Sequence, residues 1–567
     1  MNLVSIVGDR IKKHVLALGH SEKEWRILVI DQTTARLLHY ALPMSEVLSR
    51  NIAMVERIEE ARSPSKEFGV IYFVSPTSQN VKRIEKDTAQ KMYRTAYVVS
   101  VAEIQARENK TLDALCKSAE KGRAKAKESS KDHVLFEFHY KTVIFDFVPL
   151  TSDIFRVETS ASYYADKDRH IEELAEKLKS VCRTIKVHCM PVSVGMYAKK
   201  LAALLDGSGN GRAVILERGS DVNTPLIHTF TFESLLWDLG LAGPGYLVEH
   251  QKPKKSAEKD DSSAEESEDA DEKRMEVTEE HKVWESIRNR QLVEAHRALT
   301  EIIKKETSDE KSEKSNINKL VKAVQSLPAQ TRRLKEIKVL MGLLEKCVGF
   351  FNSPGIKEAA ELEQGISTGK DFKGNNFKHA VTKSLFNVLE TASLTHKEKC
   401  RLYILYVLNY GSLQKNEEKR IVERGYLSRA DIESAEAVKT HLAGRQIKPL
   451  TKRPLPIARH TPLVADVLDA IINKNETACR KLEIDLPAAH DVLTGGSLRK
   501  REFIFKKSTS SDAVHRRIII VYFIGGVSIA EISEMREIAK NTGITILIGS
   551  TDICSPGAFL DTLKGLK

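Results

Sequence analysis

The sequence lacks the patterns that mark zinc proteins, membrane spans and secreted proteins. Its seven cysteines form no CxxC pair and no spacing typical of a zinc site. No apolar run approaches the ~20 residues that a membrane-spanning helix needs. The N-terminal residues carry scattered charges and lack the apolar middle and cleavage site of a secretory signal. We therefore expect no metal site, no direct membrane insertion and a cytoplasmic location.

Motifs for phosphate binding and nucleophilic catalysis are also missing. The glycines of 206–212 precede a predicted strand, whereas a phosphate loop follows one. Gly525 and Gly526 stand between a predicted strand and a predicted helix without GxGxxG spacing, which favours a tight turn. Neither GxSxG nor HExxH occurs. The sequence thus predicts no catalytic residue and no cofactor, with a nucleotide-dependent enzyme on an α/β fold as an alternative.

The balance of charge gives only a broad indication of partners. A formal net charge of +11 favours acidic partners such as nucleic acid, an anionic membrane surface or an acidic protein. The basic residues are dispersed, however, and their local clusters contain no interleaved aromatic side chains for base stacking. We therefore expect no nucleic-acid partner.

The first half of the chain alternates between strand-like and helix-like segments. Apolar runs rich in valine and isoleucine occur at 26–30, 69–74, 96–101, 134–147 and 213–216. Helical patterns lie between them, for example at 47–58 and 171–181. This alternation predicts βαβ units with mostly parallel sheets covered by helices.

The middle of the chain changes character twice. Residues 251–280 are rich in acids and serines and are predicted to be a disordered loop. From Trp284 to about residue 475 helical periodicity dominates. Two apolar stripes, 317–327 and 334–348, flank Pro328, so this stretch is either a helical hairpin or a sharply bent long helix.

Strands return near the C-terminus and define the domain layout. The segment 516–526 is a predicted buried strand, Ser528 and Glu531 have capping-box spacing, and Ser555 is a predicted helix cap. The fold class is therefore α/β plus α: two α/β domains with mostly parallel sheets and a large helical domain inserted into the second. The predicted boundaries are 1–132 for the first domain, 133–245 with 480–567 for the second, and 246–479 for the helical domain.

One charged stretch follows the predicted strand at 213–216. Glu217, Arg218 and Asp221 could form paired catalytic carboxylates around an arginine. They could equally form a charge-paired corner between domains, because arginine can bind two carboxylates in fixed geometry. The stretch alone leaves both interpretations open.

The longer segment LERGSDVNTPLIHTFTFESLLWDL resembles the hallmark segment of the SM family, the Sec/Munc-type, syntaxin-binding regulators of SNARE-mediated membrane fusion. Arg218, Gly219, Asp221 and His228 match the family pattern, whereas Glu217 stands where an aspartate is usual. RILVIDQTTARLL, VYFIGGVSIAEISEMR and LIGSTDICSPGAFLDTLKGL resemble further family segments. The amino-acid sequences of the last two segments are most similar to those of the exocytic branch.

The resemblance implies a three-domain arch without enzymatic activity. It implies a central cleft that holds a syntaxin-type (Qa) SNARE, and a helical-domain tip that holds assembled SNARE helices, including a vesicle SNARE. The expected function is control of vesicle docking and membrane fusion, with peripheral recruitment to the plasma membrane; a Golgi or endosomal step is the alternative. Glu217, Arg218, Asp221 and His228 then belong to a structural corner.

The resemblance also carries over positions that line the cleft and the helical tip. Asp31, Arg36, Glu56 and Arg62 match cleft positions of exocytic relatives, and Pro43 replaces a common lysine. The helical-hairpin candidates for SNARE helices are Leu320, Val324, Leu327 and Pro328. Many relatives also bind an N-terminal SNARE peptide. Cys116 and Lys131 replace apolar residues of that pocket, so we expect weak or absent peptide binding.

Overall fold

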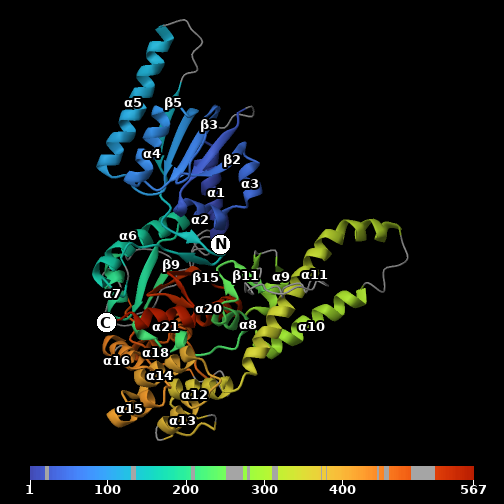
Figure 1. Ribbon diagram of the computed structural model, residues 1–567, viewed down its shortest axis with the longest axis vertical. Coiled ribbons are helices and arrows are strands. Elements are labelled where there is room, and N and C mark those ends of the chain that lie inside the picture. Colours follow the sequence, from blue (N-terminus) through green and yellow to red (C-terminus); the bar gives the residue numbers. More distant parts are fainter. Residues whose placement is uncertain are drawn as a thin grey trace, which may run out of the picture.

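Three structural units follow one another in the computed structural model (Figure 1). An N-terminal unit, drawn in blue, lies at one end. A unit of teal and red segments lies in the middle, and helices form the other end. The structure describes all residues except 20–23, 129–135, 162, 206–210, 251–271, 278–280, 310–316, 372, 378–379, 443–445, 452–458, 487–517 and 567.

The N-terminal unit is a parallel sheet of five strands in the order β2-β1-β3-β4-β5. Its strands are β1 (Arg26–Ile30), β2 (Ile52–Arg57), β3 (Ser65–Val74), β4 (Tyr93–Ser100) and β5 (Glu137–Thr142). Its helices are α1 (Leu3–Ile11), α2 (Gln32–Ala41), α3 (Met44–Leu48), α4 (Ser78–Ala89) and α5 (Ala106–Glu128), and a π-helical turn, Lys12–Leu16, follows α1. All five residues of β1 are buried, as expected for a strand covered on both faces.

Two expectations for this unit are wrong. The segment 47–58 does not form a helix: α3 ends at Leu48, Asn51 takes a left-handed conformation with φ of 57°, and β2 pairs with β1. The left-handed residue ends the helical path, and the sheet edge supplies backbone partners for β2. The first unit also extends beyond residue 132, because β5 pairs with β4 in its sheet.

The second unit is built from two distant parts of the chain. Its six-stranded sheet has the order β6-β7-β15-β13-β9-β8, parallel except for the pair β6–β7. The strands are β6 (Val148–Pro149), β7 (Ile154–Arg156), β8 (Cys189–Val194), β9 (Gly211–Glu217), β13 (Ile518–Ile524) and β15 (Thr545–Ser550). The C-terminal strands β13 and β15 thus lie between β7 and β9. The sheet therefore combines strands that precede the helical insertion in the sequence with strands that follow it.

Helices cover this second sheet. They are α6 (Lys167–Ile185), α7 (Met196–Leu204), α17 (Leu463–Ile472), α18 (Glu476–Lys481) and α20 (Ile529–Thr542). The apolar side chains of α17 share a core with this sheet. The helical domain therefore ends before Leu463, earlier than the predicted boundary at 479. A short pair of strands, β14 (Val527–Ser528) and β16 (Ile553–Cys554), and the helix α21 (Pro556–Lys564) complete the C-terminal part.

The helical unit begins after a linking region. The link holds two 3-10 turns, Arg218–Ser220 and Thr224–Leu226, the helix α8 (Phe232–Asp238), and an antiparallel sheet of β10 (Ala242–Gly243), β11 (Tyr246–His250) and β12 (Glu272–Glu276). The helices are α9 (Lys282–Ile287), α10 (Leu292–Asp309), α11 (Ile317–Phe351), α12 (Ile356–Thr368), α13 (Val381–Leu389), α14 (His396–Tyr410), α15 (Lys415–Glu423) and α16 (Arg429–Leu442). Phe559, Leu560 and Leu563 of α21 pack into the same core.

The structure decides between the two forms expected around Pro328. The helix α11 is continuous from Ile317 to Phe351, so the hairpin is excluded and one long helix contains Pro328. In Figure 1 this helix bends along its length and projects sideways together with α10. Most of the acidic segment 251–280 lies outside the described residues, but Glu272–Glu276 forms β12 rather than a disordered loop.

Helix caps read from the sequence are confirmed. Thr395 and Glu398 form a capping box at the start of α14, and Ser528 and Glu531 form one at the start of α20. Ser555 accepts a hydrogen bond from the Ala558 amide at the start of α21. Each cap satisfies backbone amides that have no partner within the helix.

Candidate functional site

Arg218 is the centre of the charged stretch that follows β9. Its guanidinium forms a two-pronged ion pair with Glu531, including an Nη1–Oε2 distance of 2.9 Å, and both side chains are 1% exposed. The guanidinium also lies over the ring of Phe523. Burial alone would lower the pKa of Arg218, but the charge and hydrogen bonds of Glu531 raise it above its ordinary value. The arginine therefore stays charged inside the protein.

The two acids beside Arg218 are bound in the same way to neighbouring parts of the fold. Glu217 accepts a 2.7 Å hydrogen bond from the Tyr163 hydroxyl and a 2.8 Å bond from the Tyr197 amide. Asp221 accepts hydrogen bonds from the amides of Thr224 and Leu463, both at 3.0 Å. Both acids are buried. Their oxygens are thus used to join β9 to α7 and α17.

His228 connects the linking region to the helical unit. Its amide donates to Glu363 of α12 at 2.8 Å, and its Nδ1 lies 2.9 Å from the same carboxylate. Arg401 of α14 lies 3.3 Å from the histidine Nε2 and donates to Asp238 at 2.9 Å. Burial would lower the pKa of Arg401, but Asp238 and Glu363 raise it. His228, Glu363 and Arg401 are buried, and Asp238 lies at the border of this second network.

Side chains of the protein occupy the space beside the two glycines that were considered for phosphate binding. Gly525 and Gly526 have φ of 90° and 98°, in the region that glycine favours. A Cβ on Gly526 would lie 2.2 Å from the sulfur of Cys554, and one on Gly525 would lie 2.8 Å from the ring of Tyr163. The pair makes a tight turn against side chains, which leaves no cradle for a nucleotide at this position.

Two of the four predicted cleft residues have partners inside the first unit. Asp31 is buried and caps α2; it accepts hydrogen bonds from the amides of Thr34 at 2.9 Å and Ser75 at 2.7 Å. The side chain of Arg62 is 6% exposed and pairs with Asp87 at 2.7 Å. Burial lowers the pKa of Arg62, but Asp87 more than compensates. Both residues hold the unit's own loops in place.

The other two predicted cleft residues reach solvent. The side chain of Arg36 on α2 is 50% exposed, and its Nη1 lies 3.1 Å from Glu158 of the second unit. Glu56 on β2 is half-buried and accepts a long 3.4 Å hydrogen bond from Tyr93. Of the four candidates, Arg36 and Glu56 are thus the ones available to a partner molecule.

Sequence reasoning missed three exposed apolar side chains of the first unit, which lie on α3 and on the neighbouring strand β2. Met44 and Leu48 of α3 are 50% and 42% exposed, and Met54 of β2 is 42% exposed. Here α3 packs beside β2, which is an edge strand of its sheet. We call Met44, Leu48 and Met54 the edge patch. Met54 is exposed on a strand at the edge of the sheet, a position that the order of segments along the chain does not reveal.

A second surface lies on the arm formed by α10 and α11. A hollow of about 460 Å³ is lined by Ile303 of α10 and by Leu334, Ile337, Lys338, Met341, Gly342 and Glu345 of α11. Leu334 is 48% exposed. The predicted candidates Leu320, Val324, Leu327 and Pro328 belong to the N-terminal part of the same α11, and their side chains lie outside the described residues. The helical spacing of apolar residues in 334–348 was the feature of the sequence that indicated the residues lining this hollow.

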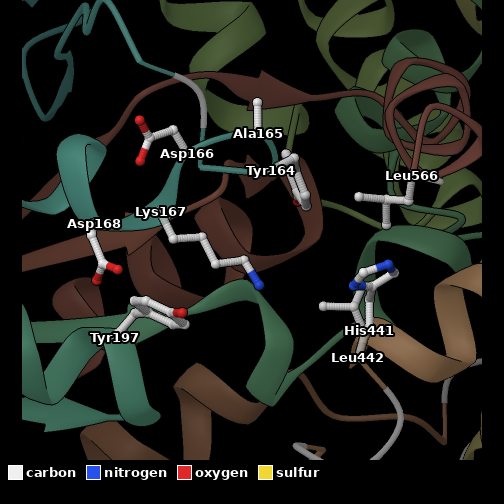
Figure 2. Close-up of a pocket in the computed structure, with 9 residues that line it drawn as sticks. All are labelled: Tyr164, Ala165, Asp166, Lys167, Asp168, Tyr197, His441, Leu442 and Leu566. Atoms are coloured by element: carbon white, nitrogen blue, oxygen red, sulfur yellow. The ribbon is translucent and has the colours of Figure 1, made fainter.

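A second hollow, of about 320 Å³, lies where the second unit meets the end of α16. Figure 2 shows the ammonium group of Lys167 extended across it toward His441. The Lys167 Nζ lies 5.4 Å and 5.2 Å from the ring centres of Tyr163 and Tyr197. These ring faces hold the cation in place by a cation–π interaction. The hollow therefore lies between two units, and Lys167 extends into it.

Comparison with known proteins identifies the family. The Sec1 family matches residues 26–562, so the chain belongs to the Sec1 family. The SM resemblance read from the motifs is thereby confirmed. A curated relative, "Protein transport protein sec1" of Dictyostelium discoideum, is 22% identical over 100% of this chain and 99% of the relative.

Solved structures confirm the fold class. The Unc18–syntaxin 1 complex from Monosiga brevicollis gives a TM-score of 0.74 at 18% identity, with 100% of both chains covered. The SM protein Vps45 in complex with the Qa SNARE Tlg2 gives 0.73 at 15% identity, covering 100% of this chain and 98% of that chain. Within the described part of the sequence, no helix combines the length and the apolar character needed to cross a bilayer.

Proposed function

We propose that this chain binds a Qa SNARE of the syntaxin type and thereby controls vesicle docking and membrane fusion. The supporting observation is the full-length likeness to two SM proteins whose structures were solved with such SNAREs. The buried networks around Arg218 and His228 support action by binding, because their polar groups are used within the fold. The nucleotide-dependent alternative loses its best candidate loop at Gly525 and Gly526.

The edge patch, together with Arg36 and Glu56, is the proposed contact surface for the Qa SNARE. Met44, Leu48 and Met54 offer apolar area that a helical partner can cover. Arg36 and Glu56 supply charges of both signs, which set the register and orientation of a partner more than its affinity. Asp31 and Arg62 act on this surface indirectly, by holding the loops that carry it.

The hollow between α10 and α11 is the proposed contact surface for assembled SNARE helices. Its lining is mainly apolar and also includes the charged residues Lys338 and Glu345. An amphipathic helix binds such a groove by placing its apolar face in it. Leu320, Val324, Leu327 and Pro328 extend the same helix toward the tip of the arm.

The proposed site of action is the plasma membrane, reached from the cytoplasm through the SNARE. The wording of the C-terminal segments supports the exocytic branch, whereas Golgi and endosomal steps are the alternatives. Titration of the purified chain with Qa SNAREs from the plasma membrane, Golgi and endosome of one cell type tests this. We expect the plasma-membrane SNARE to bind most tightly; preference for another would reassign the transport step.

Binding of the cytosolic part of a Qa SNARE, measured by calorimetry, tests the function itself. The double variant L48E/M54E places charges on the edge patch and should weaken binding at least ~10-fold, since buried unpaired charge costs more than a lost apolar contact. Arg429, whose side chain is 87% exposed on α16, provides a matched control as R429E. Absence of binding to every Qa SNARE tested, or equal affinity of the patch variant and the control, would contradict the proposal.

A further inference from the structure

Three side chains of types that bind metal ions meet between α14 and α16. His396 and Cys400 lie four residues apart on α14, and Asp431 lies near the start of α16. On a helix, residues four apart face the same side. Their ligating atoms all lie within 4.8 Å of one another. The cluster joins two helices that pack against each other in the core of the helical unit.

The spacing of the three atoms suits a tetrahedral zinc ion. His396 Nε2 lies 2.9 Å from Asp431 Oδ2, Cys400 Sγ lies 3.2 Å from Asp431 Oδ1, and the sulfur lies 3.8 Å from His396 Nε2. Zinc bond lengths of about 2.0–2.3 Å at tetrahedral angles place ligand atoms roughly 3.3–3.6 Å apart. Shifts of a few tenths of an ångström would therefore bring all three atoms to coordinating distance.

A cation of the protein already occupies this neighbourhood. The ammonium group of Lys564, from α21, lies 2.9 Å from Asp431 Oδ1 and 3.4 Å from Cys400 Sγ. The lysine side chain is 27% exposed and flexible enough to swing out to solvent. The side chain of His396 is 56% exposed, which gives an ion a path to the buried Cys400 and Asp431.

We propose that His396, Cys400 and Asp431 form a site for Zn²⁺ that competes with the ammonium group of Lys564. The ion takes the imidazole nitrogen, the cysteine thiolate and a carboxylate oxygen as ligands, and water fills the fourth position. The thiol proton is released to solvent on binding. Because Lys564 carries its charge on α21, metal binding removes one of the contacts by which that helix docks on α14 and α16.

Titration of the full chain with Co²⁺ tests the site, since cobalt reports thiolate ligation by charge-transfer absorption and tetrahedral geometry by its visible bands. We expect both signals at one equivalent, and their loss when Zn²⁺ is added. The variant C400S should lose the charge-transfer band, whereas C116S, which changes a half-buried thiol in the first unit, should keep it. Visible bands without charge transfer, or a band unchanged in C400S, would overturn the proposal.

Two further variants separate this site from adventitious binding. K564M removes the competing cation and should tighten Co²⁺ binding about 10-fold, and H396A removes an exposed ligand and should weaken it at least about 10-fold. H396A changes an exposed side chain, so the test holds even if C400S fails to fold. Affinity unchanged in both variants would contradict the inference.

Discussion

Arg218 and Glu531 lie 313 positions apart in the sequence and form a fully buried ion pair. The pair joins the end of β9, which precedes the helical insertion, to the start of α20, which follows it. Glu531 also caps α20 by accepting a bond from the Ser528 amide at 2.8 Å. The ion pair thus adds to the pairing of β13 with β9, which also joins the two halves of the discontinuous unit.

Removing one partner of this pair should destabilise the protein strongly. R218M leaves the Glu531 carboxyl group buried without its cationic partner, at an expected cost of about 3–5 kcal/mol in the free energy of unfolding. The double variant R218M/E531L leaves no charge without its counterpart and should lose less than R218M alone. Urea unfolding followed by circular dichroism measures both. The single variant E531L completes the comparison, and a double variant whose loss equals the sum of the losses of R218M and E531L would show that the two side chains do not stabilise each other.

The stability of the corner should depend on pH through Asp221. Burial alone would raise the pKa of this carboxyl, but His460, Arg218 and hydrogen-bond donors lower it below its ordinary 3.8. Its contribution is therefore complete above that value and is lost as pH falls through the lower folded-state pKa. D221N should cost about 1–3 kcal/mol at neutral pH, and the difference from the native protein should narrow in acid.

Urea midpoints between pH 3 and pH 7 measure this difference. Asp9, whose side chain is 72% exposed, provides the control variant D9N, which should leave the midpoints unchanged. A D221N deficit that stays constant down to the lowest pH would show that Asp221 does not act through its charge.

Replacing Pro328 should strengthen binding to the vesicle SNARE. Pro328 lies in the interior of α11, and proline in general lacks the amide donor that a helix interior uses and disfavours the preceding helical turn. P328A should therefore stabilise the extended helix by up to about 3 kcal/mol and make the surface on this arm easier to occupy. P328G restores the amide but favours the helix less, so its affinity should fall between the two. Unchanged or weaker binding of P328A would count against this role.

The N-terminal peptide of the SNARE should bind weakly or not at all. Cys116 is half-buried on α5, and its sulfur lies 3.4 Å from the Phe138 carbonyl oxygen, so it offers a peptide little apolar area. Lys131 lies outside the described residues. Titration of a labelled peptide against the full chain measures the affinity, and a sub-micromolar dissociation constant would refute the prediction.

Local sequence signals predicted the elements whose partners are local. In β1 the apolar run 27–30 directly precedes Asp31, and the capping boxes of α14 and α20 each need only two residues three apart. The same local signals failed for 47–58. An edge strand is exposed on part of its surface, and its polar residues then imitate the exposed face of a helix.

The proposed contact surfaces could not be predicted from the sequence, because burial and exposure there are set by residues that are distant along the chain. The burial of Arg62 follows from Asp87, which lies on a different element. Exposure of Met54 follows from the position of β2 in its sheet. The four-residue spacing of His396 and Cys400 is visible in the sequence, but Asp431 and Lys564 join them only through the packing of α16 and α21. The family resemblance supplied the four cleft candidates, and the structure shows that Arg36 and Glu56 reach solvent whereas Asp31 and Arg62 are used within the first unit.

The strand order has a consequence for biosynthesis. On the ribosome, β7 and β9 emerge long before β13 and β15, which fill the space between them only after the helical insertion has been made. Until then the nascent chain presents unpaired strand edges, which invite aggregation. Production of this protein should therefore depend on chaperones that shield the nascent polypeptide until translation is nearly finished.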